Sequence, residues 1–138
     1  MSDTPSCKSR WAAEKNSEIR TIRKLWNLYC AGNEDGDEDG CRFEEHGLAF
    51  DYVAPGTFKN TRGYWRWQIS WGGPSDEFRF YADENYNPTR IEYWFLDWYD
   101  GYGRRLTGKD EQLLHEIFQD YFSECGAVNA EYDKACNE

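Results

Sequence analysis

The stretch 64–101 constrains the fold more than any other part of the chain, because its apolar residues alternate with polar ones. In its first segment one face would carry Trp65, Trp67, Ile69 and Trp71, and the other face Tyr64, Arg66, Gln68 and Ser70. A period of two indicates a strand with one buried face and one wetter face. The run Gly72-Gly73-Pro74-Ser75 then predicts a chain reversal, since glycine adopts positive φ and proline cannot continue a central ladder.

Two further strands are predicted in the same stretch. Phe78 and Phe80 would point inward, while Glu77, Arg79 and Tyr81 would point outward. The polar turn 83–88 leads into 90–98, which carries apolar residues on both faces: Ile91, Tyr93 and Phe95 on one, and Trp94, Leu96 and Trp98 on the other. A strand covered on both sides belongs in the interior of a sheet.

The flanking segments complete the predicted architecture. Leu48, Phe50 and Tyr52 alternate in 47–53, which predicts a first strand, and the glycine-containing stretch 100–103 is expected to end the sheet. Strands joined by such short turns are expected to be antiparallel neighbours.

Two amphipathic helices are predicted outside the sheet. The helix 11–31 has an apolar stripe made of Ile19, Ile22, Leu25, Trp26 and Tyr29, and Gly32 suits its C-terminal stop. The second helix starts at Thr107, with Asp110 three residues later as in a capping box, and ends at Gly126. Its stripe is Leu113, Leu114, Ile117, Phe118, Tyr121, Phe122 and Cys125. The segment 128–135 is left open between a short helix and a frayed end.

These elements predict one α+β domain over 1–138, in which 1–9 is frayed. The order is α-β-β-β-β-α: a four-stranded, mainly antiparallel sheet with the N- and C-terminal helices packed on one face. The length of 138 residues suits a single domain, and no apolar run is long enough to span a bilayer. No basic-then-apolar signal precedes the first helix, so a cytoplasmic location is expected.

The five cysteines do not suggest a metal or disulfide framework. They lie at 7, 30, 41, 125 and 136 with no CxxC pair, so we expect reduced thiols, with Cys30 and Cys125 in the core. Together with His46 and His115 they lack the ligand spacing of a zinc site. No cofactor is predicted.

The charge of −10 is unevenly distributed. The segment 1–24 has a net charge of +3, whereas 33–51 has −7 and 109–138 has −6. Direct binding to nucleic acid is disfavoured, because that affinity depends on neutralising phosphates with Lys and Arg. A protein partner with a basic surface is favoured instead.

The most acidic stretch, 33–47, contains a possible calcium loop. Asp35, Asp37, Asp39 and Gly40 match the first half of a DxDxDG loop, where alternating carboxylates converge on one cation. The second half departs from the pattern, because His46 stands where a bidentate Glu is required and Arg42 stands where an apolar residue is usual. Both a weak calcium site and a solvated acidic loop remain open.

No catalytic motif stands out in the sequence. GxSxG, HExxH and phosphate-binding loops are missing, and only the pair Asp97 and Asp100 could serve as the acid and base of a sugar hydrolase. Such residues more often bond to the backbone of a turn. An enzyme is therefore the third interpretation, after an inhibitor and a small calcium- or ligand-binding module.

Two runs of the sheet are distinctive: SWGGPSDEFRFY at 70–81 and EYWFLDWYDGY at 92–102. They resemble small acidic accessory proteins of phages and plasmids. The resemblance implies a mobile-element origin and an anti-defence role of the anti-CRISPR or anti-restriction type, exercised in the cytoplasm of a bacterial host. It implies no functional residues.

The sequence thus predicts a non-enzymatic acidic inhibitor that binds a basic nucleic-acid-binding surface of a defence complex, with DNA mimicry as one way of doing so. The residues expected to touch the partner are Glu34, Asp35, Asp37, Glu38 and Asp39 in the loop and Glu111, Glu116, Asp120 and Glu124 on the second helix. The alternative is that these acids only keep an aromatic-rich protein soluble.

Overall fold

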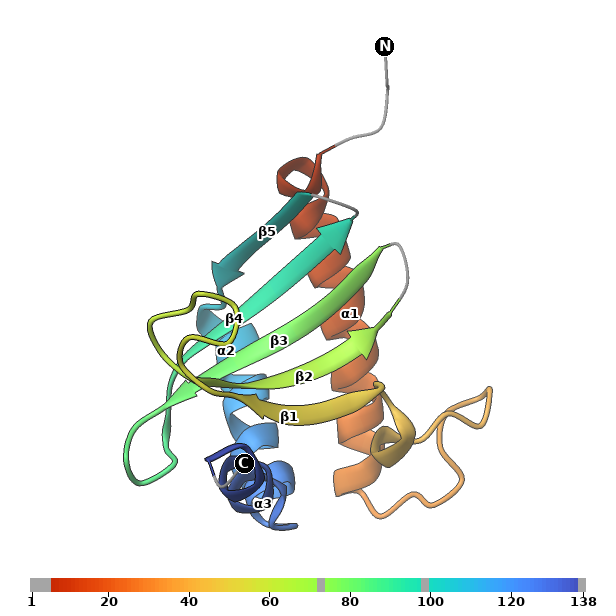
Figure 1. The fold of residues 1–138 in the computed structure, drawn as a ribbon. Coiled ribbons are helices and arrows are strands. Elements are labelled where there is room, and N and C mark those ends of the chain that lie inside the picture. Colours follow the sequence, from red (N-terminus) through yellow and green to blue (C-terminus); the bar gives the residue numbers. More distant parts are fainter. Residues whose placement is uncertain (1–5, 72–73, 98–99, 137–138) are drawn as a thin grey trace.

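A computed structural model describes residues 6–71, 74–97 and 100–136. The elements, in chain order, are α1 (Cys7–Cys30), the 3₁₀ turn η1 (Phe43–Glu45), β1 (Ala49–Val53), β2 (Tyr64–Ser70), β3 (Ser75–Ala82), β4 (Pro88–Asp97), β5 (Asp100–Arg105), α2 (Gly108–Ile117), the π-helical segment η2 (Phe118–Ser123) and α3 (Ala127–Cys136). The strands form one antiparallel meander in the order β1-β2-β3-β4-β5. Figure 1 shows α1 and α2 behind this sheet, with α3 below β1.

The α+β class and the antiparallel sheet are confirmed, but the prediction of four strands is wrong. The stretch expected to end the sheet is β5, which pairs with β4 from Asp97↔Asp100 to Glu92↔Arg105. Glycine is depleted in strands, which is why the sequence indicated a break. At Gly103 the glycine has a packing reason, because a Cβ there would lie 2.1 Å from ring atoms of Trp94.

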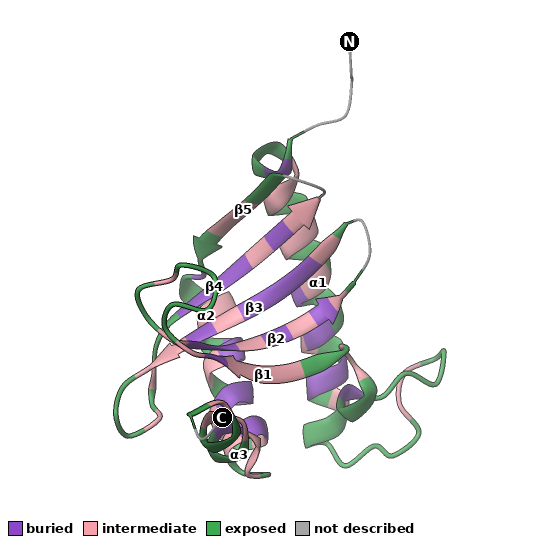
Figure 2. Ribbon diagram, viewed as in Figure 1, coloured by how far each residue is buried: buried purple, intermediate pink, exposed green. Residues whose placement is uncertain are grey.

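The face beneath the helices holds the core, as Figure 2 shows by the buried residues of α1 and of β2 to β4. Phe78, Phe80, Ile91, Tyr93 and Phe95 are buried there, as the alternation predicted. They meet the apolar stripes of α1, α2 and η2 in one cluster. Strand β4 is interior, between β3 and β5.

The predicted helices form with shifted ends. Helix α1 begins at Cys7, within the segment expected to be frayed, because Ser6 Oγ accepts the Ser9 N–H (3.2 Å) and Asp100 Oδ2 accepts the Cys7 N–H (2.8 Å). At the second helix, Thr107 stands at the N-cap position but makes no side-chain cap bond, so the predicted capping box does not form. The segment 128–135, predicted as either a short helix or a frayed end, is helical and forms most of α3.

Two residues of the first predicted strand of this stretch differ from the expected burial. Tyr64, predicted on the wetter face, is 2% exposed, and Trp71, predicted inward, is 76% exposed. The register with β3 shifts between Gln68 and Ser70, and β2 ends at Ser70, so Trp71 has left the strand. The reversal predicted at Gly72 and Gly73 and the side assigned to Trp98 lie outside the described residues.

The prediction of core positions for Cys30 and Cys125 is also wrong, because both are exposed and the buried cysteine is Cys7. Cys30 lies one turn beyond Trp26, the last buried residue of α1. An apolar stripe defines a direction around the helix but does not say where along its axis the covering layer ends.

Candidate functional site

The conformation of the acidic loop is held by hydrogen bonds from its backbone N–H groups to its own side chains. It leaves α1 at Gly32, whose φ of +77° suits the C-terminal stop predicted there. Asp37 Oδ1 accepts the backbone N–H groups of Asp39 (2.9 Å) and Cys41 (2.8 Å), while Asn33 Oδ1 accepts that of Asp35 (2.9 Å). The Cys41 N–H is the main reason why the pKa of Asp37 lies below its ordinary value. Asp37 therefore shapes the loop.

The loop gathers two of the three carboxylates predicted to bind calcium, Asp37 and Asp39, but not Asp35. The group that converges, with ligand atoms within 4.8 Å of one another, is Asp37, Glu38 and Asp39, and Asp35 lies outside it. The Lys24 ammonium pairs with Glu38 and lies 3.8 Å from Asp37 Oδ2. A cation of the protein itself thus neutralises part of the group, and the other oxygen of Asp37 is already bonded to the backbone. This arrangement favours a folded acidic loop over a calcium site.

The acidic residues predicted on the second helix differ in how free they are. Glu111 pairs with Arg105 at 3.4 Å, and Glu116 Oε2 accepts the indole N–H of Trp26 at 2.6 Å. Among the residues described, Asp120 and Glu124 make no ion pair and no side-chain hydrogen bond. The ridge therefore consists of two carboxylates with internal partners and two that face solvent.

The fold brings part of this ridge to the half of α1 from which the acidic loop leaves. The bond from Trp26 to Glu116 joins α2 to the C-terminal half of α1. Partial desolvation, followed by the charges of Glu116 and Asp120, raises the pKa of the Cys30 thiol, which lies just before the loop. We call Glu34, Asp35, Glu38, Asp39, Glu116 and Asp120 the acidic end. Figure 1 shows this loop, in orange, projecting beyond the end of α1. Glu111, next to β5, is not part of it.

The aspartates considered for hydrolysis have structural partners. Arg10 Nη1 lies 2.7 Å from Asp97 Oδ2, and Asp100 accepts the N–H groups of Cys7 (2.8 Å) and Gly101 (2.9 Å). The Cys7 N–H is the main reason why the pKa of Asp100 is lowered, which opposes a role as general acid at neutral pH. Both carboxylates fasten the start of α1 to the β4–β5 hairpin.

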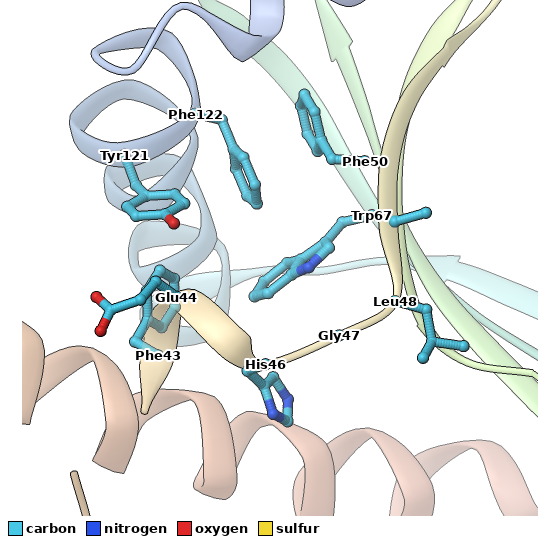
Figure 3. A pocket seen from close by; sticks show the side chains of 10 residues that line it. Phe43, Glu44, His46, Gly47, Leu48, Phe50, Trp67, Tyr121 and Phe122 are labelled. Carbon is cyan, nitrogen blue, oxygen red and sulfur yellow. The ribbon is translucent and has the colours of Figure 1, made fainter. Parts of the chain in front are cut away.

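Sequence reasoning missed an aromatic pocket of about 180 Å³ beside the start of β1 (Figure 3). Its lining comes from η1, the connecting residues 46–48, β1, β2 and η2: Phe43, Glu44, His46, Gly47, Leu48, Ala49, Phe50, Trp67, Tyr121 and Phe122. His46 Nε2 lies 2.6 Å from Glu18 Oε1, which holds the ring of His46 against α1. One signal in the sequence was usable: Tyr121 and Phe122 are adjacent, which widens the apolar stripe beyond one helical face.

No protein-family model matches this chain, so no enzyme family is identified. Neither a curated protein nor a solved structure matches it. Within the described residues, no helix combines the length and apolar character needed to cross a membrane. The chain is an α+β protein with a five-stranded antiparallel meander, an acidic end and an aromatic pocket.

Proposed function

We propose that this protein is a non-enzymatic inhibitor whose acidic end binds a basic, nucleic-acid-binding surface of another protein. One observation carries the proposal: carboxylates from the loop after α1 and from α2 and η2 are held at the same end of α1 by the Trp26–Glu116 bond. Two segments far apart in sequence thereby place carboxylates near the C-terminal half of α1.

The acidic end is available for such a contact. Glu34, Asp35, Asp39, Glu116 and Asp120 are exposed, and the carboxylates of the first three form no ion pair within the described part of the chain. Of the bases nearby, Lys24 pairs with Glu38 and Arg42 pairs with Glu44. The remaining negative charge therefore has no partner of its own and can attract a partner's Lys and Arg residues.

Opposite potentials on two proteins accelerate their encounter and make binding sensitive to salt. A surface that normally binds phosphates already presents Lys and Arg in the spacing that a row of carboxylates can meet. An acidic protein on such a surface excludes the nucleic acid by occupying its place. This is the sense in which the protein would imitate DNA.

The resemblance of the sheet runs 70–81 and 92–102 to accessory proteins of mobile elements supplies the setting for this proposal. The target would be a host defence complex of the CRISPR or restriction type in the bacterial cytoplasm. Such complexes carry basic channels for nucleic acid.

The test starts with capture of partners from a bacterial lysate, identification by mass spectrometry and purification of the captured protein. Its affinity for the wild type is then compared with that for Glu34→Gln/Asp35→Asn/Asp39→Asn, which leaves the structural Asp37 in place. We expect the triple variant to bind about tenfold more weakly at low salt, with a smaller dependence of affinity on salt, because three attractive charges are lost.

A matched control neutralises three acids elsewhere, Glu84, Glu131 and Asp133. It has the same net charge as the first triple variant but should bind like the wild type. Duplex DNA should also compete with the wild type for the captured protein. Equal weakening by both triple variants would show a non-specific effect of net charge. Unchanged affinity in the first triple variant, or a partner that binds DNA and this protein together, would contradict the proposal.

A further inference from the structure

The aromatic pocket has walls that suit a flat ring. Four of its rings meet edge to face around it: Phe43 and Tyr121 at 88° with centroids 4.9 Å apart, and Tyr121 and Phe122 at 84° and 5.2 Å. Phe122 meets Trp67 at 70° and 5.2 Å, and Trp67 meets Phe43 at 61° and 5.9 Å. Figure 3 shows these side chains around the pocket. Preformed aromatic walls of this kind are typical of small-molecule sites.

One of the polar groups that line the pocket is the indole N–H of Trp67. Four other tryptophans donate their indole N–H: Trp11 to Tyr93 O, Trp26 to Glu116, Trp65 to Val128 O and Trp94 to Glu92. Trp67 is 3% exposed, yet its Nε1–H donates to none of the residues described. This donor is therefore available to the oxygen of a ligand.

The Trp67 N–H is reachable from the pocket. No fully buried side-chain nitrogen or oxygen within the described residues lacks a hydrogen-bond partner, so Nε1 must lie in the small accessible part of Trp67. Gly47, which lines the pocket, lies against it: a Cβ at Gly47 would come within 2.6 Å of Nε1. The missing side chain at position 47 leaves space beside the N–H.

The surroundings indicate the charge of the ligand. Glu44 lines the pocket, with Arg42 already on its carboxylate at 2.6 Å, and Glu18 lies behind His46. These carboxylates would repel an anion, whereas they would not repel a neutral acceptor.

We propose that this pocket binds an uncharged small molecule with an aromatic ring, whose carbonyl or ether oxygen accepts the Trp67 Nε1–H. A volume of about 180 Å³ accommodates one substituted ring. The rings of Phe43, Tyr121 and Phe122 hold the ligand by edge and face contacts, and the indole N–H fixes its orientation. This site is separate from the acidic end and does not depend on the proposed inhibition.

The test uses two probes of the same shape, acetophenone and α-methylstyrene, which differ only in that C=O replaces C=CH₂. Each is titrated into ¹⁵N-labelled protein, and the indole N–H resonance of Trp67 is followed. Acetophenone should shift this resonance downfield and bind roughly tenfold more tightly than α-methylstyrene, the effect of one hydrogen bond. Equal affinities, no binding, or no shift at Trp67 would overturn the proposal and leave a pocket that holds only solvent.

A pair of glycine variants locates the site. Gly47→Ala places a methyl group over Nε1 and should abolish acetophenone binding. Gly56→Ala is the control, since Gly56 has nearly the same φ, +86° against +88°, but nothing within 4 Å of its Cβ position. It should bind acetophenone like the wild type. If Gly47→Ala fails to fold, the comparison of the two probes on the wild type still decides; binding retained in a folded Gly47→Ala would contradict the proposal.

Discussion

The two faces of the sheet both carry aromatic rings, but the rings are buried in different ways. On the helix side, Trp65 and Phe80 pack against Phe118 of η2, with centroids 5.7 and 5.0 Å away. On the open side no helix of the described residues covers the sheet (Figure 1), and the Arg79 guanidinium lies 4.1 Å over Trp94 and 4.9 Å over Tyr64. One face is closed by a second layer of structure and the other by stacked cations.

The charges of the open face are paired with one another. Arg79 bonds Glu77 at 2.8 Å, Arg66 bonds Asp51 through two nitrogens, and Arg90 bonds Glu92 at 2.6 Å. Segment 54–63 crosses in front of this face (Figure 1). The difference shows that the number of charges on a surface does not indicate how many of them are free to bind a partner. The ions of the open face are already paired, whereas the acidic end has carboxylates to offer.

The largest expected effect is on the helix side. Phe80→Ala removes a ring that is 0% exposed and leaves a cavity beneath η2, so the free energy of unfolding should fall by about 3–5 kcal/mol. Urea denaturation measures it. Trp71→Ala, a ring exposed to solvent, is the control and should change stability by less than about 0.5 kcal/mol. Similar losses for the two variants would contradict the assignment of the core to the helix side.

A smaller loss is expected on the open face. Arg79→Met keeps an apolar stem over Trp94 but leaves the Glu77 carboxylate, which is buried, without its partner. The free energy of unfolding should fall by about 2 kcal/mol, the range for a bond to a charged group.

The double variant Arg79→Met/Glu77→Gln separates the pair from the stacking. Because it removes the unpaired charge as well, it should be more stable than Arg79→Met alone. Both are measured by urea denaturation. The loss of stability in the double variant could instead equal the summed losses of Arg79→Met and Glu77→Gln measured separately. In that case the two ions are not coupled, and the idea that coupled ions close this face would be wrong.

The smallest effect concerns the rim of the sheet, where Asp100 caps α1. Its pKa is lowered in the folded state, chiefly by the Cys7 N–H, so its contribution to stability is present above its ordinary pKa of 3.8 and is lost as the pH falls through the folded value. Asp100→Asn cannot titrate but retains an acceptor. The drop in melting temperature from pH 7 to pH 3 should therefore be smaller in the variant, by a few degrees at most. Asp37 and Asp83, whose pKa values are also lowered, should keep part of the acid sensitivity; an unchanged drop would rule out this role for Asp100.

Much of the fold could be predicted because strand and helix periods are local properties of the chain. The alternation around Phe78, Phe80 and Tyr93 and the stripe of α1 give the buried faces without any knowledge of their neighbours. The acidic loop and ridge were equally visible as residues. Their meeting at one end of α1 was not, because it depends on the Trp26–Glu116 contact between distant segments.

The sequence by itself determined the α+β class, the inward residues of the strands and the segregation of charge, since each depends on residues close together in the chain. Only the tertiary structure decided the fifth strand, because the need for glycine at position 103 comes from the ring of Trp94 on the next strand. It also decided the burial of Tyr64 under Arg79 and the unpaired N–H of Trp67 beside Gly47. Periodicity assigns a side chain to a face of the sheet, but the atoms that cover that face come from elsewhere in the chain.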